Sequence, residues 1–429
     1  MIVQGHRARL TLPGINSQVA LFMLHSAIFS IGLMGIPDVL LNFYFISLGY
    51  DTESIGLLQS VPRIGGLLTG LPVGLLAHRL GGRRIILVSA IGAALTFFTL
   101  VMWPSLEMLG ISRFLFGFFY GAGQIASGPF MGALTERRHH THLFAYHNTV
   151  SMGASALGSF IGGYLPAMIA VWFAPMIIAD GVSPAETPFV YGGALVISGV
   201  IVLVSIWPLL RLHERHTDES ESRHADEAPP RTRNAPWPLL IWFGVPLLIF
   251  GFSGGLTFPF YNLFFRTVFD QPDAAVGTIL SIGWLGMALV PMFNPLWERY
   301  FGRSRALGIT LSVAAAAFLG LSIAPTLGLA LVAYTIGIST RNTMQPLYQP
   351  LAMDVLPPSL HHLVTSVCFV MWNIGWFMAT AISGFWQETY GFGFIMQVVA
   401  ACLLVNAVSV LLVFRGRQPH RAETIPLTH

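Results

Sequence analysis

The sequence contains no lysine and few charged residues of any kind. All 22 basic side chains in its 429 residues are arginines, and charged residues make up 10% of the chain, whereas a typical soluble domain has roughly 25%. Hydrophobic residues make up 54%, and the mean hydropathy is +0.68. Because no water-soluble fold can bury that much apolar surface, the composition excludes an ordinary soluble protein.

Cysteine is scarce as well. Cys368 and Cys402 lie inside apolar runs, where neither a metal site nor a disulfide framework can be recognised. The net charge of +3 over so long a chain argues against a nucleic-acid partner. The sequence also lacks a P-loop, and at membrane depth it lacks paired acids, a His-x-x-x-His pair and a Gly-x-Ser-Gly nucleophile. We therefore expect no enzyme, no ATP-driven pump, no metal and no bound cofactor.

What the chain has instead is a series of long apolar stretches. An apolar helix needs about 20 residues to cross a hydrocarbon layer of roughly 30 Å. Twelve stretches of this kind, separated by polar, proline or glycine breaks, begin near Val19, Thr52, Arg84, Leu106, Leu143, Phe189, Pro238, Ala274, Arg305, Leu327, His362 and Gly391. The first is too long for the apolar region of a signal peptide, so we expect it to be retained. The predicted fold is an all-α membrane protein with twelve transmembrane helices.

The arginines are distributed unevenly between the two sides of the predicted membrane. Eighteen lie in loops on one side, Arg266 lies on the other, and three lie within spans. The positive-inside rule places the arginine-rich side in the cytoplasm, together with both termini. Short loops without exposed glycosylation sequons, and arginine used in place of lysine, fit a bacterial inner membrane. We expect a multi-pass protein there, in contact with lipid and acting as a monomer.

One polar segment divides the chain. Residues 212–237 are mixed in charge and lack hydrophobic periodicity, which predicts a flexible linker. The predicted divisions are a cytoplasmic N-terminus at 1–18, a six-helix bundle at 19–211, the linker at 212–237, a second six-helix bundle at 238–414 and a tail at 415–429.

The two predicted bundles repeat each other at an offset of 221 residues. Matched pairs include Gly56 with Gly277, Gly81 with Gly302, Gln124 with Gln345, Pro129 with Pro350 and Gly163 with Gly384. An even number of spans in each half keeps the two copies parallel, related by an axis along the membrane normal. This arrangement is the one found in six-plus-six transporters.

A loop after the second span has a distinctive pattern, Gly74-Leu-Leu-Ala-His78-Arg79-Leu-Gly81-Gly82-Arg83-Arg84. It resembles the Gly-x-x-x-Asp-Arg-x-Gly-Arg-Arg signature of the major facilitator superfamily. His78 stands where that family has an acid, and Gly82 where it has a base. The second half has a looser copy from Glu298 to Arg305. The resemblance implies a secondary transporter whose gating loop contains Gly74, His78, Arg79, Gly81, Arg83 and Arg84.

Two further segments resemble elements of the same family. Arg113-Phe-Leu-Phe-Gly117 is similar to an Arg-x-x-x-Gly element of the fourth span, where the arginine is often tied to substrate or proton coupling. Gly158-Ser-Phe-Ile-Gly162-Gly163 is similar to the end of the antiporter motif in the fifth span, with Ser159 in place of proline. The second resemblance implies export, as in proton-coupled drug antiporters.

Four ionisable residues lie deep within the predicted spans: Asp38, Arg63, Arg113 and Arg341. Each lies about 12–21 Å from the outer end of its helix at 1.5 Å per residue. A charge at such depth costs at least about 2.5 kcal/mol, so it normally faces a cavity or a partner. A substrate or proton site is one interpretation, and a buried structural pair between Asp38 and an arginine is the other. Three arginines against one carboxylate favour an anionic or zwitterionic ligand.

Other polar residues extend this predicted pathway. Gln124 and Gln345 are equivalent in the repeat and predict either hydrogen bonds to a ligand or bonds between helices. His147 and Asn148 lie one turn into the fifth span, where imidazole suits either a proton relay or hydrogen-bonded packing. Aromatic residues crowd the outer halves of several spans and favour an amphipathic ligand instead.

The sequence thus predicts a secondary active transporter that moves a small organic solute by alternating access. The expected energy source is a proton or other ion gradient, and the expected direction is export of amphipathic, drug-like compounds. Uptake of a small organic anion or zwitterionic metabolite is the alternative, and a receptor or scaffold without transport is a remote one.

Overall fold

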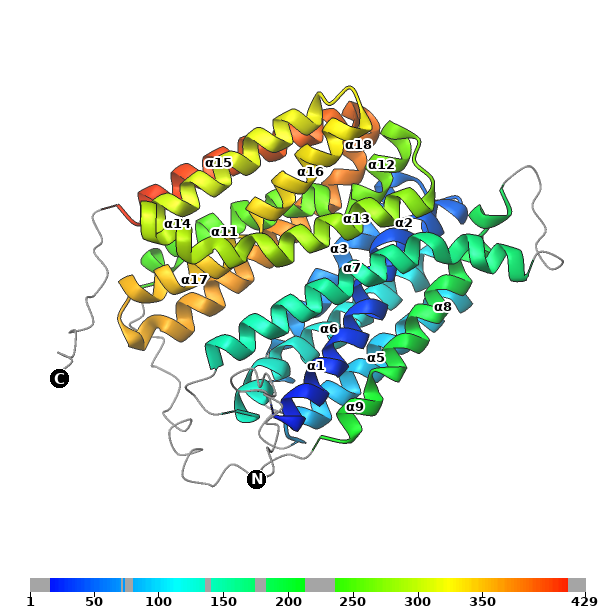
Figure 1. Cartoon of the computed structure of the whole chain (residues 1–429), viewed down its shortest axis with the longest axis horizontal. Helices are drawn as coiled ribbons and strands as arrows, with labels where there is room; N and C mark the ends of the chain where they lie inside the picture. Colours follow the sequence, from blue (N-terminus) through cyan, green and yellow to red (C-terminus); the bar gives the residue numbers. More distant parts are fainter. Residues whose placement is uncertain are drawn as a thin grey trace, which may run out of the picture.

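The structure is a computed structural model, and it describes residues 16–70, 72–73, 80–135, 140–173, 183–212 and 236–415. Throughout these ranges the regular elements are helices, and there is no strand. Figure 1 shows them in two groups, the N-terminal half in blue to green and the C-terminal half in green to red. The predicted all-α fold is confirmed.

The N-terminal half is built from the following elements: α1 (Ser17–Ser30), η1 (Ile31–Gly35), α2 (Ile36–Ser47), α3 (Thr52–Leu68), α5 (Gly82–Met102), α6 (Leu106–Ala133), α7 (His140–Trp172), η4 (Pro184–Glu186), α8 (Pro188–Val204) and α9 (Ile206–Leu210). Residues 213–235, which include most of the predicted linker, lie outside the described ranges.

The C-terminal half follows with α11 (Trp237–Thr257), η6 (Phe258–Phe260), α12 (Tyr261–Phe269), α13 (Asp273–Leu289), η7 (Val290–Phe293), α14 (Asn294–Phe301), α15 (Arg303–Ser322), α16 (Leu327–Arg341), α17 (Met344–Val355), η8 (Pro358–Leu360) and α18 (His361–Val413). Eleven of the predicted span starts lie within three residues of the start of a helix, and the twelfth is Gly391 inside α18.

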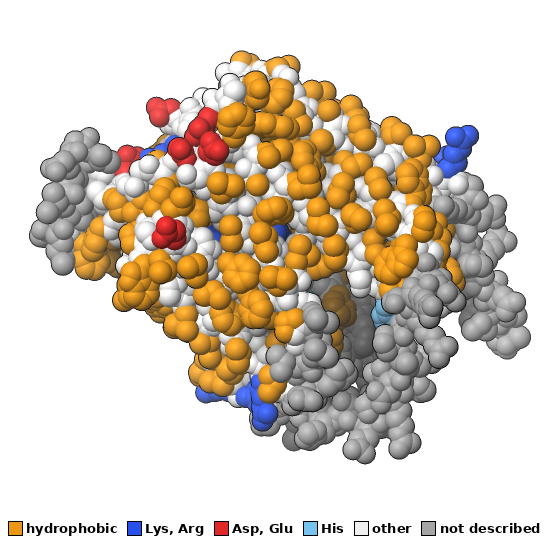
Figure 2. All heavy atoms as spheres, turned by 180° about the vertical axis from the view of Figure 1, so that it is seen from behind, with side chains coloured by type: hydrophobic (Ala, Val, Ile, Leu, Met, Phe, Trp, Pro, Cys, Tyr) orange, Lys and Arg blue, Asp and Glu red, His pale blue; other side chains and the backbone are white. Residues whose placement is uncertain are grey.

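Eight helical segments of the described chain are long and apolar enough to cross a membrane. They are 17–47, 82–102, 142–172, 188–210, 237–269, 273–301, 303–322 and 358–413. Three predicted spans outside this set fall on α3, on α6 and on α16 with α17, which contain Arg63, Arg113 and Arg341. Figure 2 shows hydrophobic side chains over most of the described surface on one face, with charged side chains few and scattered. Such a surface suits contact with lipid.

The long helix α18 reverses direction at Gly391. A straight helix of its 53 residues would be about 80 Å long at 1.5 Å per residue. The Sγ of Cys368 donates a hydrogen bond to the carbonyl of Phe243 at 3.5 Å, and the ring of Phe414 lies 5.5 Å from that of Phe243. Both arms of α18 therefore return to the same residue. Gly391 makes the turn with a φ of 78°, a conformation that favours glycine.

The first residues of α1 and α11 and the last residues of α9 and α18 lie on one face of the molecule, which we call the termini face (Figure 1). The opposite end, where α2, α12 and α16 begin or end in short connections, is the far face.

The two halves meet through glycines that the repeat makes equivalent. Gly56 of α3 packs against Gly384 of α18, and Gly163 of α7 packs against Gly277 of α13. A Cβ atom on Gly277 would lie 2.6 Å from the Cα of Gly163 and from the carbonyl oxygen of Ser159. Because only hydrogen fits at these crossings, the helices of the two halves approach backbone to backbone.

A reciprocal pair of amides joins the halves closer to the centre. The Nδ2 of Asn42 donates to the carbonyl of Pro259 at 2.6 Å and to the Oδ1 of Asn262 at 2.9 Å. The Nδ2 of Asn262 donates to the carbonyl of Val39 at 2.8 Å. Both asparagines are buried. Asn42 and Asn262 are 220 residues apart in the chain, as are Val39 and Pro259, so the contact follows the repeat of the fold. We call these four residues the amide clasp.

Charged groups add a further connection on the far face. Arg266 of α12 pairs with Asp273 in its own half and with Glu186 in the other half, and its guanidinium lies 4.6 Å from the ring of Phe43. The backbone N–H of Thr52 donates to the Oε1 of Glu388 at 2.7 Å. The halves are therefore closed against each other on the far face.

We expect Gly277→Ala to separate the halves on the far face. The added methyl group must displace backbone, and overpacking of this kind costs about 1–3 kcal/mol, which is roughly a 5- to 150-fold change in the ratio of closed to open molecules. Spin labels at Glu107→Cys and Gly328→Cys, equivalent positions in the two halves, would report a longer distance in a background without the native cysteines. Gly110→Ala is the control, since no atom lies within 4 Å of that position. An unchanged distance distribution in Gly277→Ala would contradict the assignment.

The amide clasp leads to a second prediction. Asn42→Ala and Asn262→Ala should each destabilise the closed far face relative to the open one by about 1–3 kcal/mol, because each leaves buried polar groups unpaired. The double variant should show less than the sum of the two effects, since both residues belong to one contact. The same spin-label pair measures this. Asn406→Ala is a matched control, as Asn406 is buried and its side chain accepts a hydrogen bond only from Ser409 of its own helix. Strict additivity would mean that the two asparagines act separately.

Candidate functional site

A cavity of about 820 Å³ lies between the two halves. Its walls come from α2, α3, α6 and α7 on one side and from α11, α13, α16, α17 and α18 on the other. It extends from Asp38 and Trp284 at mid-depth to Ala352 and Val364 near the termini-face ends of α17 and α18. Because the halves are joined on the far face, the cavity opens toward the termini face.

Seven of the eight residues predicted for the pathway line this cavity: Asp38, Arg63, Arg113, Gln124, Asn148, Arg341 and Gln345. The eighth, His147, does not line it. Its Nε2 lies 3.1 Å from the Oγ of Ser26, and its ring stacks on Phe22 at 5.7 Å inside the N-terminal half. In the structure His147 thus lies outside the cavity and packs within the N-terminal half.

Asp38 lies in the first turn of α2, directly after the π-helical turn η1, and its side chain is half-buried. Its Oδ2 accepts a hydrogen bond from the Nε1 of Trp284 in the other half at 2.9 Å. None of the ion pairs among the described residues includes Asp38. The structural Asp–Arg pair considered from the sequence is thus not formed, and the carboxylate instead links the two halves through an indole.

Arg113 on α6 is hydrogen-bonded to residues of α3, in its own half. Its Nη2 donates to the Oε1 of Gln59 at 2.8 Å and its Nε to the carbonyl of Leu58 at 3.4 Å. The guanidinium lies 4.9 Å from the ring of Phe116. Gln59 in turn donates from Nε2 to the Oδ1 of Asn42 at 2.6 Å, so a continuous chain of hydrogen bonds joins Arg113 to the amide clasp.

Arg341 on α16 is held in a similar way in the other half. Its Nη2 donates to the carbonyl of Phe250 at 2.7 Å, its Nε donates to the Oγ of Ser253 at 3.4 Å, and it lies 4.2 Å from the ring of Phe250. At the repeat offset, Arg341 corresponds to Tyr120 and Arg113 to Tyr334. Each half therefore contributes one arginine and one tyrosine from this helix, at exchanged positions.

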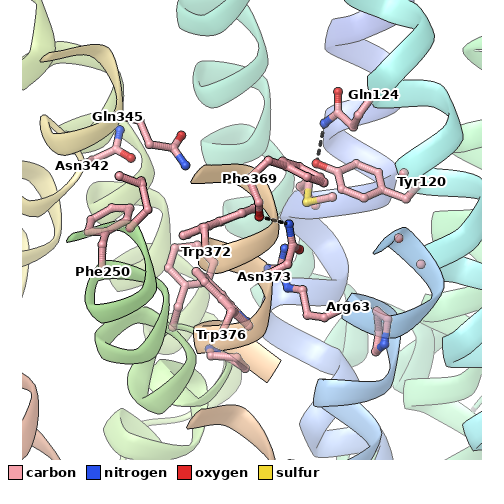
Figure 3. A pocket seen from close by; sticks show the side chains of 18 of the residues that line it. Arg63, Tyr120, Gln124, Phe250, Asn342, Gln345, Phe369, Trp372, Asn373 and Trp376 are labelled. Atoms are coloured by element: carbon pink, nitrogen blue, oxygen red, sulfur yellow. Dashed lines mark hydrogen bonds between the residues drawn. The ribbon is translucent and has the colours of Figure 1, made fainter. Parts of the chain in front are cut away.

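Arg63 on α3 differs from both. Its guanidinium lies 4.2 Å from the ring of Trp376 and 4.9 Å from that of Trp372, both from the opposite half (Figure 3). It is half-buried, and it makes no hydrogen bond or ion pair with the described residues. Arginine faces attract aromatic rings electrostatically, so this contact bridges the two halves across the cavity.

The three remaining predicted residues of the cavity, Gln124, Asn148 and Gln345, are exposed. Gln124 donates from Nε2 to the Oη of Tyr120 one turn back on the same helix at 2.5 Å, and Gln345 makes no hydrogen bond with the described residues. Neither of the predicted bonds between helices is formed by this pair. Asn148 makes a long contact of 3.7 Å to the sulfur of Met152.

The predicted gating loop is described only in part. Gly74, His78 and Arg79 lie outside the described residues. Gly81 precedes α5 with a φ of 78°, and its repeat partner Gly302 precedes α15 with a φ of 75°. Arg83 donates to the carbonyls of Leu209 and Leu210 at 3.0 and 2.6 Å, and Arg84 is exposed.

In the second copy of that loop, Arg303 pairs with Glu298 at 3.0 Å and with Asp354, tying α15 to α14 and α17 on the termini face. This contact lies within one half. It holds the C-terminal bundle together, and it does not join the halves.

Sequence reasoning did not single out Gln59, Asn42 or Asn262, which form the core of the polar network. One signal was present: the first span of each half contains an asparagine, at an offset of 220 rather than 221. Among the described residues, no group of three or more His, Cys, Asp or Glu side chains could hold a metal ion. The charged residues of the described cavity lining are three arginines and one carboxylate, which lie among amide, aromatic and aliphatic side chains.

Three solved transporter structures have a similar architecture. The D-xylose–proton symporter structure covers 92% of this chain and 96% of its own at a TM-score of 0.72 and 13% identity. A bacterial homologue of the human lysosomal transporter Spinster covers 92% and 96% at 0.71 and 14% identity, and the nucleoside transporter NupG covers 93% and 98% at 0.67 and 14% identity. These similarities show a common fold.

Sequence comparison agrees with the structural one. A tetracycline resistance protein of class E from Escherichia coli is 23% identical over 250 residues, which are 57% of this chain and 56% of that protein. The match thus spans a little over half of the relative's length. The family model of the Major Facilitator Superfamily matches residues 21–380. The chain belongs to the Major Facilitator Superfamily.

Proposed function

We propose that this chain is a proton-coupled secondary transporter that exports an amphipathic organic solute by alternating access. Family membership makes the chain a transporter of small molecules, and the coupling ion, the direction and the solute class are the proposal. The observation that supports it most is the cavity between the halves, which ends at a single carboxylate hydrogen-bonded across the interface.

The positions of the contacts between the two halves support alternating access. The amide clasp, the glycine crossings and the Arg266 contacts close the far face, while the cavity reaches the termini face. Rocking the two bundles about the cavity would break the far-face contacts and bring the termini-face helices together. Such rigid-body motion is the usual mode for paired bundles of this symmetry.

Asp38 is the group that we propose carries the proton. As a carboxylate it accepts a charge-assisted hydrogen bond from Trp284, and protonation would remove the charge and weaken this bond between the halves. The state of the carboxyl group is therefore linked to separation of the halves. A proton moving down a membrane potential releases about 2.3 kcal/mol per 100 mV, which is enough to drive solute uphill more than tenfold. No bound cofactor is needed.

The direction and the solute class rest on separate observations. Described arginines gather near the helix ends of the termini face, at Arg83, Arg84, Arg299, Arg303, Arg305 and Arg415, which supports a cytoplasmic position for that face and for the cavity entrance. The partial antiporter motif at 158–163 and the resistance role in the name of the E. coli relative favour export. Phe116, Phe250, Trp284, Trp372 and Trp376 supply an aromatic lining that suits an amphipathic solute.

A second candidate is uptake of a small organic anion or zwitterion. It is favoured by the three arginines of the cavity against one carboxylate. The two candidates differ in direction, since only a proton-coupled exporter concentrates solute inside inverted membrane vesicles whose interior has been acidified.

Purified protein in liposomes loaded with the pH dye pyranine tests the proposal. Tetracycline or naphthalene-1-sulfonate, added outside, should move protons in the wild type. Asp38→Asn should reduce this flux to the level of protein-free liposomes, because the amide cannot take up a proton, while its oxygen can still accept from Trp284. Asp51→Asn is the matched control, since Asp51 caps α3 on the far face and asparagine caps equally well. Wild-type flux in Asp38→Asn would reject Asp38 as the proton site.

A further inference from the structure

We infer that Arg63 is the solute-binding cation of the cavity, and that it binds an anionic group such as a sulfonate, carboxylate or phosphate attached to an aromatic body. This inference rests on the proposed function for its setting, and it names the substrate class. It separates Arg63 from the other two cavity arginines by what each guanidinium already contacts.

The guanidinium groups of Arg113 and Arg341 are already hydrogen-bonded to neighbouring helices. Both are more than nine-tenths buried, and each donates to a backbone carbonyl of a helix beside its own, at Leu58 and Phe250. Each also donates to a side chain of that neighbouring helix, Gln59 and Ser253. A ligand would have to displace these bonds and leave buried acceptors unpaired. Their contacts join helices within a half.

Arg63 has the opposite arrangement. The carbon of its guanidinium lies 4.9 Å from the ring centroid of Trp372 and 4.2 Å from that of Trp376, and the group makes no hydrogen bond with the described residues. An indole ring offers no lone pair to accept a hydrogen bond, so the N–H groups of the guanidinium have no acceptor among the described residues. These donors form a fork that matches the two oxygens of an oxyanion. The tryptophans also restrict the rotamers of the side chain, so less entropy is lost when an anion binds.

The charge balance of the cavity points to the same ligand. Asp38 is the one acidic residue among the described residues that line it, and Trp284 is its hydrogen-bond partner. Arg63 has no ion-pair partner in the described chain, so its charge is uncompensated in surroundings of aromatic rings. A positive charge in such surroundings is costly until an anion joins it.

A series of neighbouring aromatic rings, which we call the aromatic ladder, provides a surface on which the rest of the ligand can pack. Trp372 lies 5.5 Å from Trp376, Trp376 lies 5.7 Å from Phe258, and Phe258 lies 5.7 Å from Trp284. The ladder belongs to the C-terminal half and runs from Arg63 to Asp38, both of the N-terminal half. A ligand whose anionic end is bound by Arg63 and whose aromatic body lies along the ladder contacts both halves.

Thermal unfolding of the purified protein with three matched probes tests this assignment. The probes are naphthalene-1-sulfonate, its neutral sulfonamide and a naphthylmethyl-trimethylammonium cation. A ligand that binds only the folded state raises Tm. We expect the sulfonate to give the largest increase in the wild type, none in Arg63→Gln and a smaller one in Arg63→Lys, which keeps the charge and loses the fork. Arg63→Gln without ligand should unfold near the wild-type Tm, since Arg63 makes no hydrogen bond with the described residues.

Arg211→Gln is the matched control. The Arg211 guanidinium also lies on an indole, 4.0 Å from Trp207, but outside the cavity. This variant should keep the full response to the sulfonate. Equal stabilisation of Arg63→Gln and wild type by the sulfonate, a stronger response to the cation, or no response of the wild type to the sulfonate would each overturn the assignment.

The pyranine assay keeps this inference distinct from the proposed function. Proton movement driven by the cation and retained in Arg63→Gln would reject the Arg63 site and keep the transporter. Stabilisation by the sulfonate that depends on Arg63, without proton movement for any of the three probes, would keep the binding site and reject proton-coupled transport.

Discussion

The backbone-to-backbone approach of the two halves, at Gly56 with Gly384 and at Gly163 with Gly277, is the constraint on which the rest of the structure depends. Glycine lets the helices meet without side chains between them, and it brings Asn42 within hydrogen-bond distance of Asn262. With the far face closed in this way, the space between the halves extends toward the termini face, to Ala352 and Val364. The cavity is thus a consequence of where small residues occur in four helices.

Polar groups in the interior obey a second constraint, since a bilayer core supplies no water for unpaired donors and acceptors. Arg113, Gln59 and the amide clasp satisfy one another in a chain that crosses the interface, and Arg341 satisfies carbonyl and hydroxyl acceptors within its own half. Among the described residues, the partners of Asp38 and Arg63 are indole rings of the opposite half. These two are the groups whose contacts change most readily with the separation of the halves or with a bound solute.

Much of the fold was predictable because the bilayer imposes a length and an apolar composition on every span. Eleven of the twelve span starts agree with the helices to within three residues. The four glycines of two repeat pairs form the crossings between the halves, Gly56 with Gly384 and Gly163 with Gly277. The candidate cavity residues were predictable for a similar reason: a deep ionisable side chain is rare and normally faces a cavity or a partner. His147 departed from this pattern because a hydroxyl and a phenyl ring inside its own bundle receive it.

By itself, the sequence determined the helices, the two-fold repeat, the uneven distribution of arginine and the depth of Asp38, Arg63, Arg113 and Arg341. Hydrophobic length, periodicity and charge are local properties, so they can be seen without the fold. Only the tertiary structure decided the partners of each charge, because a guanidinium reaches whichever acceptor or ring another helix brings within a few ångströms. The three arginines look alike in the sequence, and their different surroundings leave Arg63 as the one of the three without a hydrogen bond to the described residues.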